Sequence, residues 1–200
     1  MNYLAHMLLA GEEPIQRLGS LIADFTRGRT ERLAKQYPPQ LVRGIVLHRR
    51  IDRFTDLHPE VLRSKQRFSS QRRRYAGIIV DILYDHYLSL HWQRYTASSR
   101  GAFIIDAYRL LQENQHYLPE RLHRIAPLMI EQDWLGSYQR IEEIGSVYER
   151  LSGRLRQPNS LAGAIDEVRL HYLELEQDFT AFFPDLLTHA VHLDRTIESV

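Results

Sequence analysis

Apolar residues recur at intervals of three and four along almost the whole chain, which places them on one face of an α-helix. One example is the set Ile141, Ile144, Tyr148 and Leu151. We find no sustained alternation of apolar and polar residues, the pattern typical of a half-buried strand. The sequence therefore predicts an all-α fold of about eight or nine helices.

Proline, glycine and serine residues separate the apolar segments, and each such position is expected to end a helix. No separating stretch is long enough to be a linker between domains, and we find no internal repeat. We therefore expect residues 1–200 to form one compact multi-helix domain. The expected helix stops are Pro38, Pro39, Pro59, the segment 98–101, Pro119, Gly136, the segment 158–160 and Pro184.

The composition is that of a folded protein, because 44% of the 200 residues are hydrophobic and 26% are charged. No apolar run approaches the roughly 20 residues of a membrane-spanning helix, and the first ten residues lack the basic start of a signal peptide. The chain contains no cysteine, which excludes disulfides, thiolate metal sites and a cysteine nucleophile. These features favour a cytoplasmic protein with no membrane association.

Positive charge gathers in the first half of the chain, although the formal net charge is only +1. Residues 1–100 hold 17 Lys and Arg against 9 Asp and Glu, and the segment 41–80 alone holds 10 against 3. Nearly all of these cations are arginines, whose planar fork suits contacts with phosphate and carboxylate groups. We therefore expect an anionic partner to approach the segment 41–80.

Two carboxylates lie one turn apart in a helix expected at roughly 74–97. Asp81 and Asp85 share a face with Ile78 and Leu88, so apolar residues stand above and below both charges. Two like charges in such a setting require a cation or a shared proton. A metal or acid–base role and a structural network with arginines both remain open for this pair.

A second pair, His48 and Asp52, has the same spacing in a helix expected at about 39–54. Histidine at this spacing is a natural metal partner, and Asp56 and His58 follow in the turn before a proline. Asp24 lies near the end of an apolar helix, where it opposes the helix dipole unless a cation compensates. His6 has apolar neighbours on both sides, and a histidine with this spacing is more often a core residue than part of a site.

Aspartate and histidine without cysteine favour Mn²⁺ or Mg²⁺, although such sites also accept iron or zinc. A divalent ion combined with arginines suits phosphate-ester chemistry. The sequence contains no Gly-rich phosphate loop, no G-x-S-x-G motif and no HExxH motif, which argues against nucleoside triphosphatases, serine hydrolases and zincin proteases.

These residues lie in blocks that resemble the acyl carrier protein phosphodiesterase family. The resemblance extends over nearly the whole chain, and residues 48–59 and 73–86 are its most specific parts. A weaker similarity covers residues 172–184. The blocks are residues 1–6 (MNYLAH), 20–28 (SLIADFTRG), 44–59 (GIVLHRRIDRFTDLHP) and 73–86 (RRYAGIIVDILYDH).

The resemblance implies a helical fold distantly related to the HD metal-dependent phosphohydrolases. It also implies Mn²⁺-dependent release of 4′-phosphopantetheine from holo-acyl carrier protein. The contiguous His-Asp doublet of the HD proteins is absent, and the nearest pair is the reversed Asp85-His86. We therefore rank the metal ligands by the helical faces and the family blocks, which gives Asp24, His48, Asp52, Asp81 and Asp85.

Under this resemblance a metal-activated water attacks the phosphorus, and His86 or His58 protonates the serine oxygen that leaves. His6 and His86 are additional candidates for ligands or acid–base groups. The acidic carrier protein is expected to dock on the segment 41–80, and no nucleic acid or membrane partner is expected. The expected carrier or phosphate contacts are Arg49, Arg53, Arg72, Arg73 and Arg74.

Two other functions remain open. An HD-type phosphohydrolase acting on nucleotides or other small phosphodiesters would keep the metal and lose the protein partner. A non-catalytic module would use the basic segment to hold an acidic protein or RNA.

Overall fold

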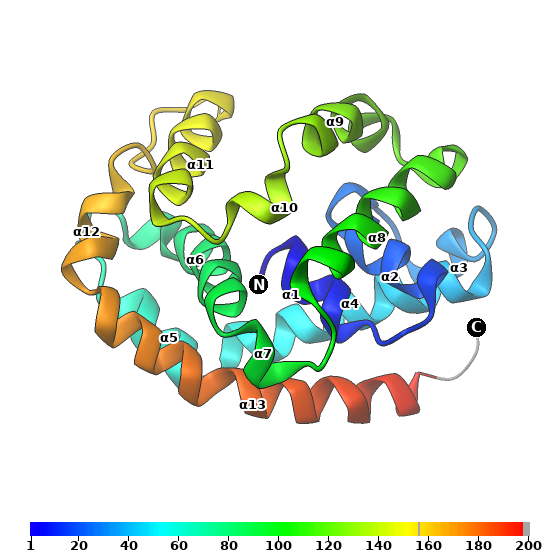
Figure 1. The fold of residues 1–200 in the computed structure, drawn as a ribbon, viewed down its shortest axis with the longest axis horizontal. Coiled ribbons are helices and arrows are strands. Elements are labelled where there is room, and N and C mark those ends of the chain that lie inside the picture. The colour runs from blue at the N-terminus through cyan, green and yellow to red at the C-terminus, as the bar shows by residue number, and fades with distance from the viewer. Residues whose placement is uncertain (156, 198–200) are drawn as a thin grey trace.

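The computed structural model describes residues 1–155 and 157–197, and across these residues the secondary structure is helical with no strand. The predicted all-α fold is confirmed (Figure 1). The α-helices are α1 (Tyr3–Leu9), α2 (Pro14–Ile22), α3 (Thr30–Leu33), α4 (Pro39–Leu57), α5 (Pro59–Gln66), α6 (Ala76–Leu90), α7 (Trp92–Tyr95), α8 (Arg100–Glu113), α9 (Glu120–Glu131), α10 (Trp134–Ser137), α11 (Ile141–Arg154), α12 (Ala164–Leu170) and α13 (Tyr172–Thr196). Short 3₁₀ helices are η1 (Ala23–Phe25), η2 (Arg73–Tyr75) and η3 (Gln115–Tyr117).

The described part of the chain has more helices than the eight or nine expected, and three of them, α3, α7 and α10, are single turns of four residues. The helix expected at 74–97 is divided into η2, α6 and α7. The helix expected at 39–54 continues as α4 to Leu57, so Asp56 lies within a helix and not in the turn. Within the described residues, no helix combines the length and apolar character needed to cross a membrane.

Helices α2 and α4 cross with their backbones nearly in contact. A Cβ atom on Gly44 would lie 2.0 Å from the carbonyl oxygen of Gln16, and one on Gly19 would lie 2.1 Å from that of Leu41. Only glycine fits at such a crossing, because any side chain would overlap the opposite backbone. The close approach brings the residues that follow α2 against the middle of α4.

Two of the expected helix stops are wrong. Pro184 lies inside α13, where it removes one backbone hydrogen bond but leaves Phe182, Phe183 and Leu186 fully buried. The apolar area of these side chains offsets the lost hydrogen bond and keeps the helix continuous. Gly136 lies inside α10, because the Asp133 side chain accepts from the Gly136 N–H and so caps a new turn.

One continuous hydrophobic core extends from Met1 to Ile197. Figure 1 shows α13 along one edge of the molecule and the amino terminus near its middle, beside α6. In this view helices α10 and α11 lie above the amino terminus (Figure 1). The first residues of the chain therefore lie between α4, α6 and α11, which is where the candidate site is found.

Candidate metal centre and its pocket

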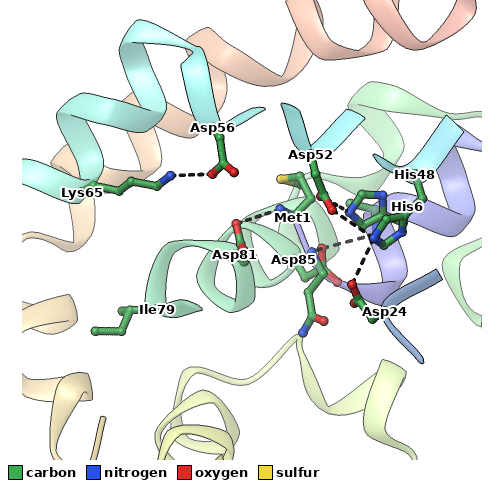
Figure 2. Close-up of polar contacts among 12 residues, drawn as sticks. Met1, His6, Asp24, His48, Asp52, Asp56, Lys65, Ile79, Asp81 and Asp85 are labelled. Carbon is green, nitrogen blue, oxygen red and sulfur yellow. Dashed lines mark hydrogen bonds and ion pairs between the residues drawn. The ribbon is translucent and has the colours of Figure 1, made fainter. Parts of the chain in front are cut away.

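Three potential metal ligands from two helices meet beneath the amino terminus. His6 comes from α1, whereas His48 and Asp52 lie one turn apart on α4. The Asp52 carboxylate reaches both imidazoles, with Oδ1 3.0 Å from Nε2 of His6 and Oδ2 3.1 Å from Nε2 of His48. One donor atom from each of the three residues can be chosen so that all lie within 4.8 Å of one another (Figure 2).

The two imidazoles are stacked and incompletely hydrogen-bonded. Their ring centres are 3.7 Å apart, with an angle of 20° between the planes. In the described structure both ring nitrogens of His6 and the Nδ1 of His48 are buried without a hydrogen-bond partner. His6 Nε2 is close to Asp52, but its orientation does not form a hydrogen bond. Buried polar atoms normally have partners, so the unpartnered Nε2 of His6, which faces Asp52, is available to bind a cation.

A fourth side chain, that of Asp24, adjoins this group. It lies in η1, directly after α2, and its Oδ1 is 3.2 Å from His48 Nε2. The side chains of Asp24 and Asp52 are 51% and 41% exposed, whereas those of His6 and His48 are 1% and 4% exposed. The imidazoles therefore form the inner side of the centre, and the two carboxylates face the open side.

The pKa values of these four residues are shifted from their ordinary values in different directions. Burial, reinforced by the nearby His48, lowers the pKa of His6 to about 4, so its imidazole is neutral. Burial also opposes charge on His48, but the contacts with Asp24 and Asp52 outweigh it and raise its pKa to about 9. Although burial favours the neutral acid, the histidines hold the pKa values of Asp24 and Asp52 below their ordinary range. At neutral pH the group therefore contains two ionised carboxylates, a protonated His48 and a neutral His6.

This donor set fits a divalent metal ion. A neutral imidazole, a second imidazole that can release its proton, and two ionised carboxylates are all ligands of borderline divalent ions. A metal ion would also replace the missing partner of His6 Nε2. The residues that would hold it are His6, His48 and Asp52, with Asp24 beside them.

Asp85 and Asp81 contact the start of the chain and not the histidines. The buried Asp85 carboxylate accepts from the backbone N–H groups of Asn2, Leu4 and Ala5, at 3.2, 2.8 and 3.3 Å. It thereby caps the first turn of α1. Burial raises the pKa of Asp85 to about 7, opposed by the amino-terminal charge and these hydrogen bonds.

Asp81 accepts from the Met1 amino group at 2.8 Å (Figure 2). Burial raises the Asp81 pKa, and the ammonium of Met1 opposes this shift. Burial opposes charge on the Met1 amine, but attraction to Asp81 and Asp52 outweighs it and raises the pKa of the amine. The cation required by the Asp81–Asp85 pair is therefore largely supplied by the chain itself.

An Asp85→Asn variant is expected to separate capping from metal ligation. The amide NH₂ group would face one of the three backbone donors, so unfolding should cost about 1 to 2 kcal/mol less than for the wild type. Bound metal should stay at the wild-type level. Chemical denaturation and elemental analysis measure the two effects. Loss of metal without loss of stability would instead make Asp85 a ligand.

A pocket of about 280 Å³ opens on the carboxylate side of the centre. Its wall comes from the amino terminus, η1, α4, α6 and the segment from α10 to α11. Acidic, basic and apolar side chains all contribute to the lining. The lining residues are Met1, Asn2, Tyr3, Asp24, Asp52, Thr55, Asp56, Ile78, Asp81, Ile82, Trp134, Tyr138, Val147, Arg150, Leu151 and Arg154.

The two histidines predicted as acids lie elsewhere. His86 is buried, with Nδ1 2.7 Å from the carbonyl oxygen of Tyr138 and Nε2 2.7 Å from the hydroxyl of Tyr172. His58 joins α4 to α5 and is 3.4 Å from Asp185. Within the described chain neither residue lines the metal-side pocket.

The arginines predicted to bind phosphate or carrier also lie outside this pocket as described. Arg49 donates to the carbonyl of Gly28, and Arg73 to that of Phe68. Arg72 forms an ion pair with Glu167 at 3.0 Å. Arg53 lines a separate groove between α4 and α13, and the Arg74 guanidinium lies 5.8 Å from the ring centre of Tyr75. Much of the basic segment therefore serves internal contacts.

Sequence reasoning missed Arg150 and Arg154, which line the pocket from α11. They are one turn apart, and Val147 and Leu151 on the same helix line the pocket with them. This pattern of two arginines beside an apolar face was the available signal, although it resembles an ordinary solvated helix face.

The sequence comparisons with known proteins all indicate the same family, and they cover nearly the full length of this chain. The sequence model of a family described as acyl carrier protein phosphodiesterase matches residues 1–186. Among curated proteins carrying that name, the chain is 35% identical to one from Photorhabdus laumondii subsp. laumondii, over 97% of each chain. It is 35% identical to one from Serratia proteamaculans, over 95% of this chain and 97% of that protein. It is 33% identical to one from Yersinia pestis, over 96% and 98%. No solved structure matches.

Proposed function

Because this chain belongs to the acyl carrier protein phosphodiesterase family, we propose that it hydrolyses the phosphodiester between 4′-phosphopantetheine and a serine of holo-acyl carrier protein. The products are apo-acyl carrier protein and free 4′-phosphopantetheine. The observation that carries this proposal is the pair of buried imidazoles, His6 and His48, that face Asp52 without sufficient hydrogen-bond partners at the base of an open pocket.

A divalent ion bound here would supply Lewis acidity and a water molecule of lowered pKa. His6 and His48 hold the inner side of the centre, and Asp52 contacts both of them from the pocket side. Asp24 is ionised and open to the pocket, so it is placed to orient the attacking water and accept its proton. Neither His58 nor His86 is among the residues that line the described pocket, and the His86 ring nitrogens are occupied by Tyr138 and Tyr172, so in this proposal solvent protonates the leaving serine oxygen.

We propose Mn²⁺ as the ion. Two imidazoles in the donor set disfavour Mg²⁺, which prefers oxygen ligands and retains most of its waters. We also propose that the carrier is acidic and approaches the basic side of α4, where Arg50 and Arg53 line an exposed groove. A cytoplasmic location agrees with the absence of cysteine but is likewise part of the proposal.

Intact-mass measurement on holo-acyl carrier protein tests the reaction directly. Incubation with the purified protein and Mn²⁺ should remove the whole phosphopantetheine mass, and EDTA should prevent this loss. Added Mn²⁺ should restore turnover after the chelator is removed. An unchanged carrier mass with every divalent ion tried would refute the proposed substrate, and turnover that survives complete metal removal would refute the metal role.

A further inference from the structure

Two arginines of α11 stand on the pocket wall that also includes Asp24 and Asp52. Arg150 and Arg154 are separated by one helical turn, so their side chains project from the same side of α11. Both are exposed residues at the rim of the pocket. The pocket thus combines these two guanidinium groups with four carboxylates, of which Asp56 and Asp81 are already paired with Lys65 and the Met1 amine.

Within the described residues, neither arginine side chain forms an ion pair or hydrogen bond. By contrast, Arg140 at the start of the same helix is paired with Glu143, and Arg63 and Arg67 are both paired with Asp178. The Arg154 guanidinium lies 5.5 Å from the ring centre of Trp134, which leaves its hydrogen-bond donors free. Two unpaired guanidinium groups in one pocket form a site for an anion.

Apolar side chains line the pocket together with the arginines. Val147 and Leu151 lie on the same helix as the arginines, and Ile78 and Ile82 enter from α6. The volume of about 280 Å³ is at the small end of ligand sites. It suits a phosphate group with the neighbouring part of a flexible organic chain, and it is too small for a folded partner.

We propose that Arg150 and Arg154 are the phosphate-binding residues for the 4′-phosphopantetheine group, and that Val147, Leu151 and Ile78 contact the arm next to the phosphate. The inference rests on the proposed function for the identity of the ligand. A planar guanidinium can hold two phosphate oxygens at once, which orients the phosphorus towards the metal centre. These arginines therefore replace the arginines of residues 72–74 as the phosphate contacts.

The test compares Arg150→Gln, Arg154→Gln and the double variant with Arg140→Gln, which removes a paired arginine at the N-cap of the same helix. Isothermal titration calorimetry measures binding of free 4′-phosphopantetheine and of pantetheine to the Mn²⁺-loaded proteins. Each pocket substitution should weaken binding of the phosphorylated compound by about tenfold or more, because a charge-assisted hydrogen bond is lost. Binding of pantetheine, metal content and the Arg140→Gln variant should stay close to wild type.

Turnover of holo-acyl carrier protein separates this inference from the proposed function. If the wild type releases the arm and the double variant does so with the same KM and kcat, the arginine assignment is overturned while the function stands. If the wild type does not act on the carrier but binds 4′-phosphopantetheine through both arginines, the assignment stands while the function fails. A wild-type protein that does not bind 4′-phosphopantetheine overturns the assignment, whatever its turnover.

Discussion

An Asp52→Asn variant is expected to lose at least about 100-fold in turnover, together with most of its bound metal. Residues that merely orient metal ligands already contribute roughly 10- to 100-fold, and Asp52 is placed as a ligand itself. It is also the residue that contacts both histidines. The amide keeps the size of the side chain but removes the charge that attracts the cation. Initial rates on holo-acyl carrier protein and elemental analysis measure the two losses.

Asp56→Asn is the matched control, since Asp56 lies one turn further along α4. Its carboxylate is 67% exposed and pairs with Lys65 at 2.7 Å (Figure 2). Such a surface pair contributes little to stability, so this variant should keep its metal and lose no more than a few-fold in turnover. Equal losses in the two variants would show that carboxylate charge on α4 matters in general, and would remove the specific role of Asp52.

A Gly44→Ala variant is expected to unfold with a free energy about 2 to 3 kcal/mol below that of the wild type. The added methyl group would meet the carbonyl of Gln16 at 2.0 Å, and backbone cannot move aside as the end of a flexible side chain can. At this chain length the melting temperature should fall by roughly 4–12 °C. Because α4 must shift away from α2, the distance between Asp24 and His48 should grow, and Mn²⁺ affinity should fall as well.

A Gly153→Ala variant is the matched control, because the same substitution at this position is not expected to lower the stability. Gly153 lies in α11, and a Cβ atom there has no neighbour within 4 Å. Alanine favours a helix over glycine by up to about 1 kcal/mol, so this variant should be as stable as the wild type or slightly more stable. Thermal unfolding of both variants, monitored by circular dichroism, measures this difference in stability. A Gly44→Ala protein as stable as Gly153→Ala would show that the two helices do not cross at backbone contact.

The helical periodicity was sufficient to predict the fold class, and the i, i+4 spacing was sufficient to pair His48 with Asp52. Both depend only on the geometry of a single helix. Asp81 and Asp85 show the limit of that reasoning. Their apolar surroundings indicated a need for a cation or a shared proton. The cation is the Met1 amino group, 80 residues away in the sequence, and backbone N–H groups from the same end of the chain contact Asp85.

The same limit explains Pro184 and the two pocket arginines. A proline interrupts an isolated helix, but α13 is held by buried aromatic residues from elements distant in sequence. Arg150 and Arg154 resemble a solvated face until the fold places α11 opposite the metal centre. The clustered arginines of the segment 41–80 suggested a surface for an anionic partner, but several of them are paired within the protein. Their carboxylate partners, such as Asp178 and Glu167, belong to the last quarter of the chain, so the local sequence does not reveal the pairing.

The anchoring of α1 by Asp85 also affects the order in which the centre can assemble during folding. Asn2, Leu4 and Ala5 reach Asp85 across 83, 81 and 80 residues. Contacts of such long range require the closure of a large loop, so they are slow to form compared with the nearby pairing of α2 and α4. A chain emerging from the ribosome would therefore hold His48 and Asp52 in place before His6, and would bring the three residues of the candidate metal centre together only after α6 has been synthesised.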